Sequence, residues 1–457
     1  MKTLPYPAAL VSLLAICLSG VALPAAAWSN HALGTWQALS ATLASSRTPD
    51  VRVESLESFL TAEGHALEPL LRQEEQWASA HVPEYPQRPE ALAFVASADA
   101  GQNRQRFLAA LRINPQAKLP LYLQLRPGAD VTGETLLPWS AVTTLQHSAS
   151  VMNAHFLRLQ EAQSVAALEV VASASDEPDY GLDLGLWENN PGAQALGYGF
   201  GKQPFGNPAL EYSSQAPFHM GFFHESPIVY KAAGFLRRTY PQYRIHLYQT
   251  LASHALRSGH PYWGWRFAGW ALHYVQDLTQ PYHTKVLPGV SVPRMLWINA
   301  LDLMGAHGSK QEVVTRVSNR HAALENYQYR RMRAAYQRKD SADALHEDAL
   351  LQAARDKPDD AQHAAYTADS VRQNISLQSH DAADATDAAL EQLLPEKTIS
   401  DPHYVFGETE PEIDLFAVLA AASPQQQARM TDMVSGLMHY FGAQSRSFMQ
   451  TLLPPRR

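Results

Sequence analysis

The chain has 457 residues but only one cysteine, Cys17, so it cannot form an internal disulfide. Its stability must therefore come from an apolar core or from bound metal ions. Long apolar runs are also lacking, because the run from Ala8 to Ala22 is too short for a membrane-spanning helix. Signals for β-strands are scarce, and only short stretches such as residues 119–125 have the composition of an extended segment. These absences argue against a disulfide-stapled domain, an integral membrane protein and an all-β fold.

The first residues have the three parts of a secretion signal. Lys2 supplies a positive charge, the run from Ala8 to Ala22 is apolar, and small residues at 25–27 precede Trp28. We expect residues 1–27 to be removed as a signal peptide, so that the mature protein begins at Trp28 and is secreted or periplasmic. Loss of Lys2 leaves 35 of the 36 basic residues against 44 acidic ones, a formal net charge of −9. Such an acidic chain argues weakly against nucleic acid as a partner, because basic surfaces bind it.

Helical periodicity recurs along the rest of the chain. It covers residues 33–43, 56–77, 91–111, 151–172, 228–256, 265–278, 313–336 and 425–453. The sequence predicts an all-α protein with one mainly helical domain over residues 28–457. Residues 339–387 are rich in Ala, Asp, Gln and His, a composition that indicates exposed helices or a mobile insert.

The stretch from Trp265 to His283 carries the clearest chemical signal. His273 and Asp277 are four residues apart in a helical segment, so both project from one face. Their neighbours are apolar, and a buried, unpaired aspartate is costly unless a cation compensates its charge. Pro281 ends the helix and leaves His283 on the following loop, within about one turn of the pair. An isolated pair at this spacing is more often structural, but these flanks indicate a buried metal site.

Further candidate ligands occur near the N-terminus and in a later helix. His321 and Glu325 repeat the four-residue spacing. Trp28 would supply a free α-amino group after signal cleavage, and His31 follows it at the head of a helix. Without the other clusters, His31 would be interpreted as a capping or surface residue.

Two loops supply the remaining candidates. An acidic turn contains Asp179 and Asp183, which are candidate ligands or bases, although acidic loops are usually only solvated. His219 and His224 lie among aromatic residues just before a long helix, and either of them is a candidate ligand.

In their chain order, these motifs resemble those of the trinuclear zinc family that contains bacterial zinc-dependent phospholipases C and P1/S1-type nucleases. The motifs are an N-terminal Trp, an early His, Pro-Asp-Tyr, an aromatic-flanked His, His-x-x-x-Asp, Pro-Tyr-His and His-x-x-x-Glu. The resemblance is strongest over residues 263–283. It implies a multi-helix phospholipase C/P1 nuclease-like fold with long inserted loops, in which residues 28–457 are the catalytic domain. The residues from about 330 would form an atypical C-terminal extension.

The resemblance also implies three zinc ions. One would be bound by Asp179, either His219 or His224, His273 and Asp277. A second would be bound by the amine and carbonyl of Trp28, His31 and a bridging Asp277, and a third by His283, His321 and Glu325. Imidazoles and carboxylates without thiolates suit Zn²⁺.

The implied activity is that of a zinc-dependent phospholipase C, which hydrolyses phosphatidylcholine-like lipids to diacylglycerol and a phosphorylated head group at a membrane surface. Asp179 would orient or deprotonate the attacking water, and Tyr180 would face choline through cation–π attraction. A P1/S1-type nuclease or 3′-nucleotidase would use the same cluster, and a zinc-stabilised helical interaction protein would need no catalysis. A helix expected at 292–304 would pack into the core, the favoured interpretation, or contact lipid.

Overall fold

A computed structural model describes residues 28–44, 48–146, 149–191, 197–338, 347–355, 365–404 and 413–453. This part of the chain is mostly helical with two small sheets, in agreement with the predicted class. The α-helices are α1 (His31–Ala38), α2 (Leu56–His81), α3 (Ala100–Leu111), α4 (Ala149–Met152), α5 (Ala167–Ala174), α6 (Glu211–His219), α7 (Pro227–Ala232), α8 (Pro241–Ser258), α9 (Pro261–Asp277), α10 (Val292–Leu303), α11 (Gly308–Gln337), α13 (Ala349–Ala354), α14 (Ser376–Leu393), α15 (Glu396–Ile399), α16 (Leu415–Ala420) and α17 (Pro424–Gln450). Among these described helices, none has the length and apolar character needed to cross a membrane.

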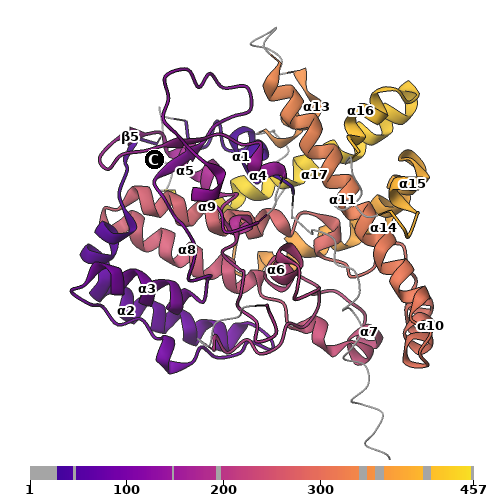
Figure 1. Cartoon of the computed structure of the whole chain (residues 1–457), viewed down its shortest axis with the longest axis horizontal. Coiled ribbons are helices and arrows are strands. Elements are labelled where there is room, and N and C mark those ends of the chain that lie inside the picture. The colour runs from indigo at the N-terminus through magenta and orange to yellow at the C-terminus, as the bar shows by residue number, and fades with distance from the viewer. Residues whose placement is uncertain are drawn as a thin grey trace, which may run out of the picture.

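Helix α9 is the centre of the fold. Pro261 occupies its first turn, where a missing N–H is harmless, and every residue from Tyr262 to Asp277 is buried. Helix α8 lies alongside α9, and α5 and α17 also pack against it (Figure 1). Gly269 permits the approach of α5, because a Cβ atom at this position would lie 2.5 Å from the Cβ atom of Ala174. A larger residue there would push the two helices apart.

The first helix and the last helix of the described chain pack together. A Cβ atom on Gly34 of α1 would lie 2.6 Å from the ring of Phe441 on α17, so glycine is required for this contact. The rings of Trp28 and Phe441 meet edge to face with centroids 6.2 Å apart. The described residues beyond 330 therefore complete the core around the N-terminal helix.

The expectation of exposed helices or a mobile insert over residues 339–387 is wrong for the described part of this stretch. Leu351 and Ile375 are fully buried. Asp387 on α14 is also buried and accepts a hydrogen bond of 2.8 Å from the hydroxyl of Tyr282. The frequent Ala and polar residues of this segment obscure, in the sequence, the few large apolar side chains that pack inward.

Two small antiparallel sheets interrupt the helical pattern. Strand β1 (Val51–Arg52) pairs with β5 (Ser164–Val165), and β4 (Phe156–Arg158) pairs with both β2 (Tyr122–Gln124) and β3 (Leu136–Leu137). The helix predicted over 151–172 is therefore wrong, because two strands lie between α4 and α5. Their pairing partners are far away in the sequence, so local periodicity does not reveal them. The extended segment predicted at 119–125 does contain β2.

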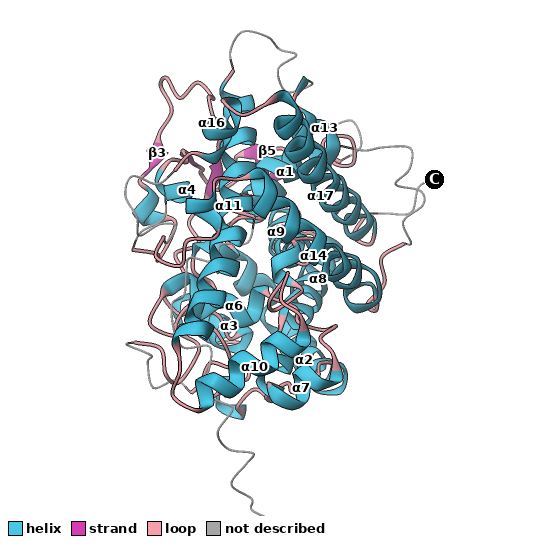
Figure 2. Cartoon of the chain, turned by 90° about the vertical axis from the view of Figure 1, so that its right-hand side faces the viewer, coloured by secondary structure: helices cyan, strands magenta, loops and turns pink. Residues whose placement is uncertain are grey.

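The predicted helix over 228–256 is divided in two. Gly234 and Pro241 interrupt it, so α7 is followed by a 3₁₀ turn (Gly234–Arg237) and then by α8. The helix expected over 292–304 forms as α10. It lies beside α7 and also contacts α11 (Figure 2).

Candidate metal centre

His273 and Asp277 lie on the last turns of α9, and neither residue is exposed. The approach of α5 at Gly269, one turn earlier, brings the carbonyl oxygen of Ser175 to 2.7 Å from Nδ1 of His273. A carbonyl oxygen only accepts hydrogen bonds, so Nδ1 carries a proton and Nε2 of the neutral ring has a free lone pair. The fold thus fixes His273 in the tautomer that a metal ligand requires.

The two carboxylate oxygens of Asp277 face different histidines. Oδ2 lies 2.9 Å from Nδ1 of His219 and 3.3 Å from Nε2 of His273. Oδ1 lies 3.4 Å from Nε2 of His31 and 3.8 Å from Nδ1 of His283. A carboxylate in this position can bridge two cations.

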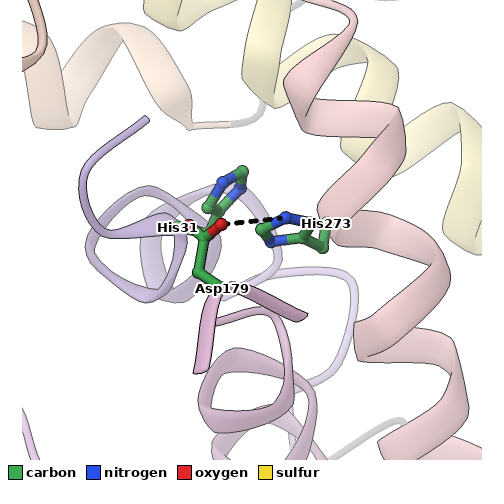
Figure 3. A group of neighbouring side chains, drawn as sticks. All are labelled: His31, Asp179 and His273. Carbon is green, nitrogen blue, oxygen red and sulfur yellow. Dashed lines mark ion pairs between the residues drawn. The ribbon is translucent and has the colours of Figure 1, made fainter. Parts of the chain in front are cut away.

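His31, Asp179 and His273 form the first group of side chains that can hold a metal ion, with ligand atoms within 4.8 Å of one another. Figure 3 shows them converging from α1, from the turn at Pro178–Tyr180 and from α9. Asp179 Oδ1 lies 3.7 Å from His273 Nε2. The Nδ1 atom of His31 lies 2.8 Å from the amide oxygen of Gln276, which can only accept, so Nε2 again has the free lone pair.

The start of α1 is held in place by a buried carboxylate. Asp176 accepts hydrogen bonds from the backbone N–H groups of His31, at 2.5 Å, and Ala32, at 3.1 Å. The other carboxylate oxygen of Asp176 accepts from the side-chain amide of Gln124 at 2.7 Å. These bonds satisfy N–H groups that the first turn of a helix leaves unpaired, and they fix the position of His31.

His219, His273 and Asp277 form the second group. Nδ1 of His219 lies only 3.0 Å from Nε2 of His273, and both nitrogens face the Asp277 carboxylate. Two nitrogens so close together require a proton or a cation between them. A metal ion at this point would satisfy all three donors.

Asp183 supports His219 from the side opposite to Asp277. Its Oδ2 atom lies 3.3 Å from Nε2 of His219 and accepts a hydrogen bond of 2.7 Å from the Tyr274 hydroxyl. Its Oδ1 atom accepts from Arg244 at 2.5 Å. The sequence indicates Asp183 as a ligand or a base, but the structure places it behind the imidazole, where a carboxylate orients a metal-binding histidine.

His283, His321 and Glu325 form the third group. On α11, Nε2 of His321 lies 2.7 Å from Oε1 of Glu325, one turn away as the spacing predicts. His283 donates its Nδ1–H to the carbonyl oxygen of His219 at 3.1 Å. Its Nε2 atom is buried and has no hydrogen-bonding partner within the described ranges. An orphaned acceptor of this kind is expected where a cation binds.

The protonation states of these groups favour a cation. Burial lowers the pKa of both His283 and His321 to about 3, so both imidazoles are neutral at ordinary pH. Burial raises the pKa of Glu325 well above its usual range and that of Asp179 to about 7. The neutral imidazoles offer lone pairs to a metal ion. The positive charge of such an ion would compensate the negative charge of carboxylates that otherwise resist ionisation. The donors in all three groups therefore fit metal ions that prefer nitrogen and oxygen ligands.

Trp28 lies against α9, close to the ligands. Its indole N–H donates a hydrogen bond of 3.2 Å to the carbonyl oxygen of Gln276, and the side chain is buried. The expected signal segment, residues 1–27, lies outside the described residues. Coordination by the free amine of Trp28 therefore stays a prediction.

The structure distinguishes the two alternatives at residues 219 and 224. His224 lies outside all three groups, with its Nε2 atom 2.9 Å from the hydroxyl of Ser376 and its ring 5.7 Å from that of His380. His219 is the histidine that faces Asp277. Because both residues have aromatic neighbours, the sequence alone could not separate them.

Tyr180 differs from its expected position. Its ring is buried in a small apolar cluster and meets Phe156 edge to face at 5.9 Å, while its hydroxyl donates to the side chain of Gln124. It therefore packs the turn that carries Asp179, and it has no exposed face for a choline group. Gln276, Ser175 and Asp176, which orient the candidate ligands, have no recognisable motif in the sequence.

Comparison of the chain with protein-family models, with curated proteins and with solved structures gives no match.

Proposed function

We propose that the chain is a secreted, zinc-dependent phosphodiester hydrolase that acts on phospholipids as a phospholipase C. The observation that carries the proposal is the position of Asp277, whose two oxygens face ligands of different groups. Groups whose ligands lie on both sides of one carboxylate favour a polynuclear centre over isolated structural ions. Polynuclear centres are typical of enzymes that hydrolyse phosphate esters.

The ligand count favours catalysis over a purely structural role. Each group provides three protein side chains, with His273 common to the first and second groups, whereas structural zinc sites are usually closed by four protein ligands. Asp179 is the most exposed of these ligands, because its side chain is 14% exposed, that of His321 is 8% exposed, and those of His273 and Asp277 are fully buried. Substrate and water would therefore reach the centre beside Asp179.

The chain's own residues define the proposed mechanism. His31, His219, His273, His283, His321, Asp179, Asp277 and Glu325 would hold the ions. When bound, zinc ions supply charge neutralisation for a phosphodiester and lower the pKa of water. Asp179 would orient the attacking water and accept its proton. The water oxygen forms the new bond to phosphorus, the bond to the glycerol oxygen breaks, and that oxygen takes up a proton to give diacylglycerol.

Phospholipid is preferred to nucleic acid as the substrate because the net charge of the whole chain is −8, and of the expected mature chain −9. Proteins that bind polyanions usually present a basic surface. A phospholipid presents a single phosphodiester, which the cations of the centre would themselves neutralise.

The test compares two substrates on the purified protein. Zinc-loaded protein should release phosphocholine from phosphatidylcholine and leave single-stranded DNA intact, and chelation should abolish lipid hydrolysis. Cleavage of DNA without lipid hydrolysis would assign the nuclease alternative instead. Retention of zinc with neither activity would favour a zinc-stabilised interaction protein.

A further inference from the structure

Helices α7 and α10 expose large apolar side chains at one corner of the protein. On α10, Trp297 is 62% exposed and Leu296 is also exposed, and Met304 directly after the helix is 71% exposed. Ile228 on the neighbouring α7 is 55% exposed. Figure 2 shows the two helices beside each other. Core packing accounts for Met295 and Ile298 of α10, which are buried, but not for these four residues, which we call the α7–α10 surface.

Within the stretches 227–238 and 286–304, the exposed charged residues are all cationic. Lys231 and Arg237 follow Ile228, and Arg294 precedes Leu296, and all three cationic side chains are exposed. The only acidic residue in the stretches 227–238 and 286–304 is Asp302, which is buried and paired with Lys310 at 3.1 Å. A cationic apolar surface on a chain of net charge −8 is a local feature, not a consequence of composition.

An apolar cavity of about 60 Å³ lies beneath the α7–α10 surface. Its lining includes Val229, Leu236, Val286, Leu287, Met295 and Ile298. The inner side chains of α10 therefore leave a gap against the body of the protein.

The same apolar cluster reaches the candidate metal centre. Val286, three residues after His283, and Ala216, one turn before His219, both belong to the cluster that contains Val229 and Met295. The α7–α10 surface is thus connected through directly packed residues to elements that carry the second and third ligand groups.

We propose that the α7–α10 surface docks the protein on a bilayer that contains anionic phospholipids. The apolar side chains would enter the boundary between head groups and acyl chains, and Lys231, Arg237 and Arg294 would contact the anionic head groups. This proposal rests on the proposed phospholipase function, because it supplies the contact with an interface that a water-soluble enzyme needs to reach a bilayer substrate.

Flotation with vesicles tests the docking on the metal-free full chain, in which hydrolysis cannot consume the vesicles. The protein should bind vesicles of phosphatidylcholine with phosphatidylglycerol more strongly than vesicles of phosphatidylcholine alone. Trp297→Ser should weaken binding about tenfold, and Arg294→Gln about fivefold on the anionic vesicles only. Val95→Ser, which changes a residue of similar exposure outside this surface (Val95 is 54% exposed), should bind as the unsubstituted chain does.

Unchanged vesicle binding in Trp297→Ser would overturn the proposal. A second result would also overturn it: the unsubstituted chain does not bind vesicles and runs as a dimer in gel filtration, and Trp297→Ser dissociates this dimer. The surface would then join two copies of the chain. Hydrolysis of the soluble substrate p-nitrophenylphosphorylcholine separates docking from catalysis. If Trp297→Ser still hydrolyses this soluble substrate but no longer binds vesicles, the docking proposal is supported. If the unsubstituted chain binds vesicles but cleaves no phosphodiester, docking is supported and the proposed function is refuted.

Discussion

Oδ1 of Asp277 lies 3.4 Å from Nε2 of His31, and neither atom has a hydrogen-bonding partner among the described residues. Both atoms are completely buried. Because Nδ1 of His31 is engaged by Gln276, its Nε2 and the carboxylate oxygen are two acceptors that face each other. A buried pair of acceptors repels unless a proton or a metal ion lies between them, and a metal ion at this point would fit the proposed centre.

Asp277→Asn is expected to remove at least two metal ions together. The amide keeps the size of the side chain but loses the charge that offsets cations on both of its sides. Elemental analysis of the purified variant should show a fall of at least two ions per chain, with loss of hydrolysis and a lower melting temperature.

Glu325→Gln is the matched control, since it also exchanges a buried carboxylate for an amide. It should affect mainly the third group, because Glu325 contacts His321 and Gln280 and belongs, with His283, to that group alone. Full metal content and activity in Asp277→Asn would show that α9 is not the centre of the site.

The sequence predicts ligands that lie within one helix better than it predicts their surroundings. The spacings of His273 with Asp277 and of His321 with Glu325 place each pair on one helical face, and the structure has both pairs in this arrangement. The choice of His219 over His224 depends instead on where α6 ends relative to α9, a tertiary relationship that no local pattern contains.

The supporting residues are missed for a similar reason. Ser175 contributes a backbone carbonyl, which has no residue preference, and it reaches His273 only because Gly269 lets α5 approach α9. The two small sheets were also missed, because their strands are two or three residues long and pair with distant segments.

Asp183→Asn should weaken metal binding in the second group by about ten- to a hundredfold. The carboxylate lies 3.3 Å from Nε2 of His219 and stabilises the ring in the orientation that directs Nδ1 toward Asp277. Titration with zinc in competition with a chelator would measure the change. Tyr274→Phe removes only the hydroxyl that donates to Asp183, so a smaller loss is expected from it.

If Asp183 served only to neutralise Arg244, the two variants would differ in stability but not in zinc affinity. Thermal unfolding of both metal-free proteins provides this comparison. Asp183→Asn leaves the buried Arg244 without its charge partner and should unfold at a lower temperature than Tyr274→Phe.

Metal loading should release protons and become tighter as the pH rises. Burial alone would lower the pKa of His219, but the carboxylates of Asp183 and Asp277 outweigh it and raise this pKa to about 10. In the metal-free protein His219 therefore holds a proton near neutral pH that a metal ion must displace. Calorimetric titration with zinc in buffers of different ionisation enthalpy would count the released protons.

The same shift makes the metal-free protein less stable at alkaline pH. The folded chain keeps the His219 proton that the unfolded chain loses above the ordinary value of 6.5, so this contribution is complete below pH 6.5 and is lost as the pH rises toward 10. Each such proton changes the free energy of unfolding by about 1.4 kcal/mol per pH unit. The melting temperature of chelated protein should fall over this range, and zinc-loaded protein should lack the dependence on His219.

An N-terminal extension should reduce the metal content. If the mature chain begins at Trp28, its free amine can bind a metal ion, whereas a peptide nitrogen in an extended chain cannot replace it. Mass spectrometry of secreted protein would locate the first residue, and zinc analysis would compare mature and extended chains. Equal zinc content in both would exclude the amine as a ligand.

Tyr180→Phe should lower the hydrolysis of phosphatidylcholine and of phosphatidylethanolamine by the same factor. The Tyr180 hydroxyl bonds to Gln124, Gln124 bonds to Asp176 at 2.7 Å, and Asp176 holds the N-terminus of the helix that carries His31. Loss of the hydroxyl leaves the buried amide oxygen of Gln124 short of a donor, at a cost of about 1–3 kcal/mol. Both substrates depend equally on His31, so the effect should be independent of the head group.

Tyr198→Phe is the control for this prediction, because Tyr198 also has a buried hydroxyl but one without a hydrogen-bonding partner among the described residues. It should retain activity and zinc. A selective loss of phosphatidylcholine hydrolysis in Tyr180→Phe would instead mean that the Tyr180 hydroxyl contributes to head-group selection. Since the ring is only 7% exposed and is enclosed by apolar neighbours, such selectivity would require the turn at Pro178–Tyr180 to open when substrate binds.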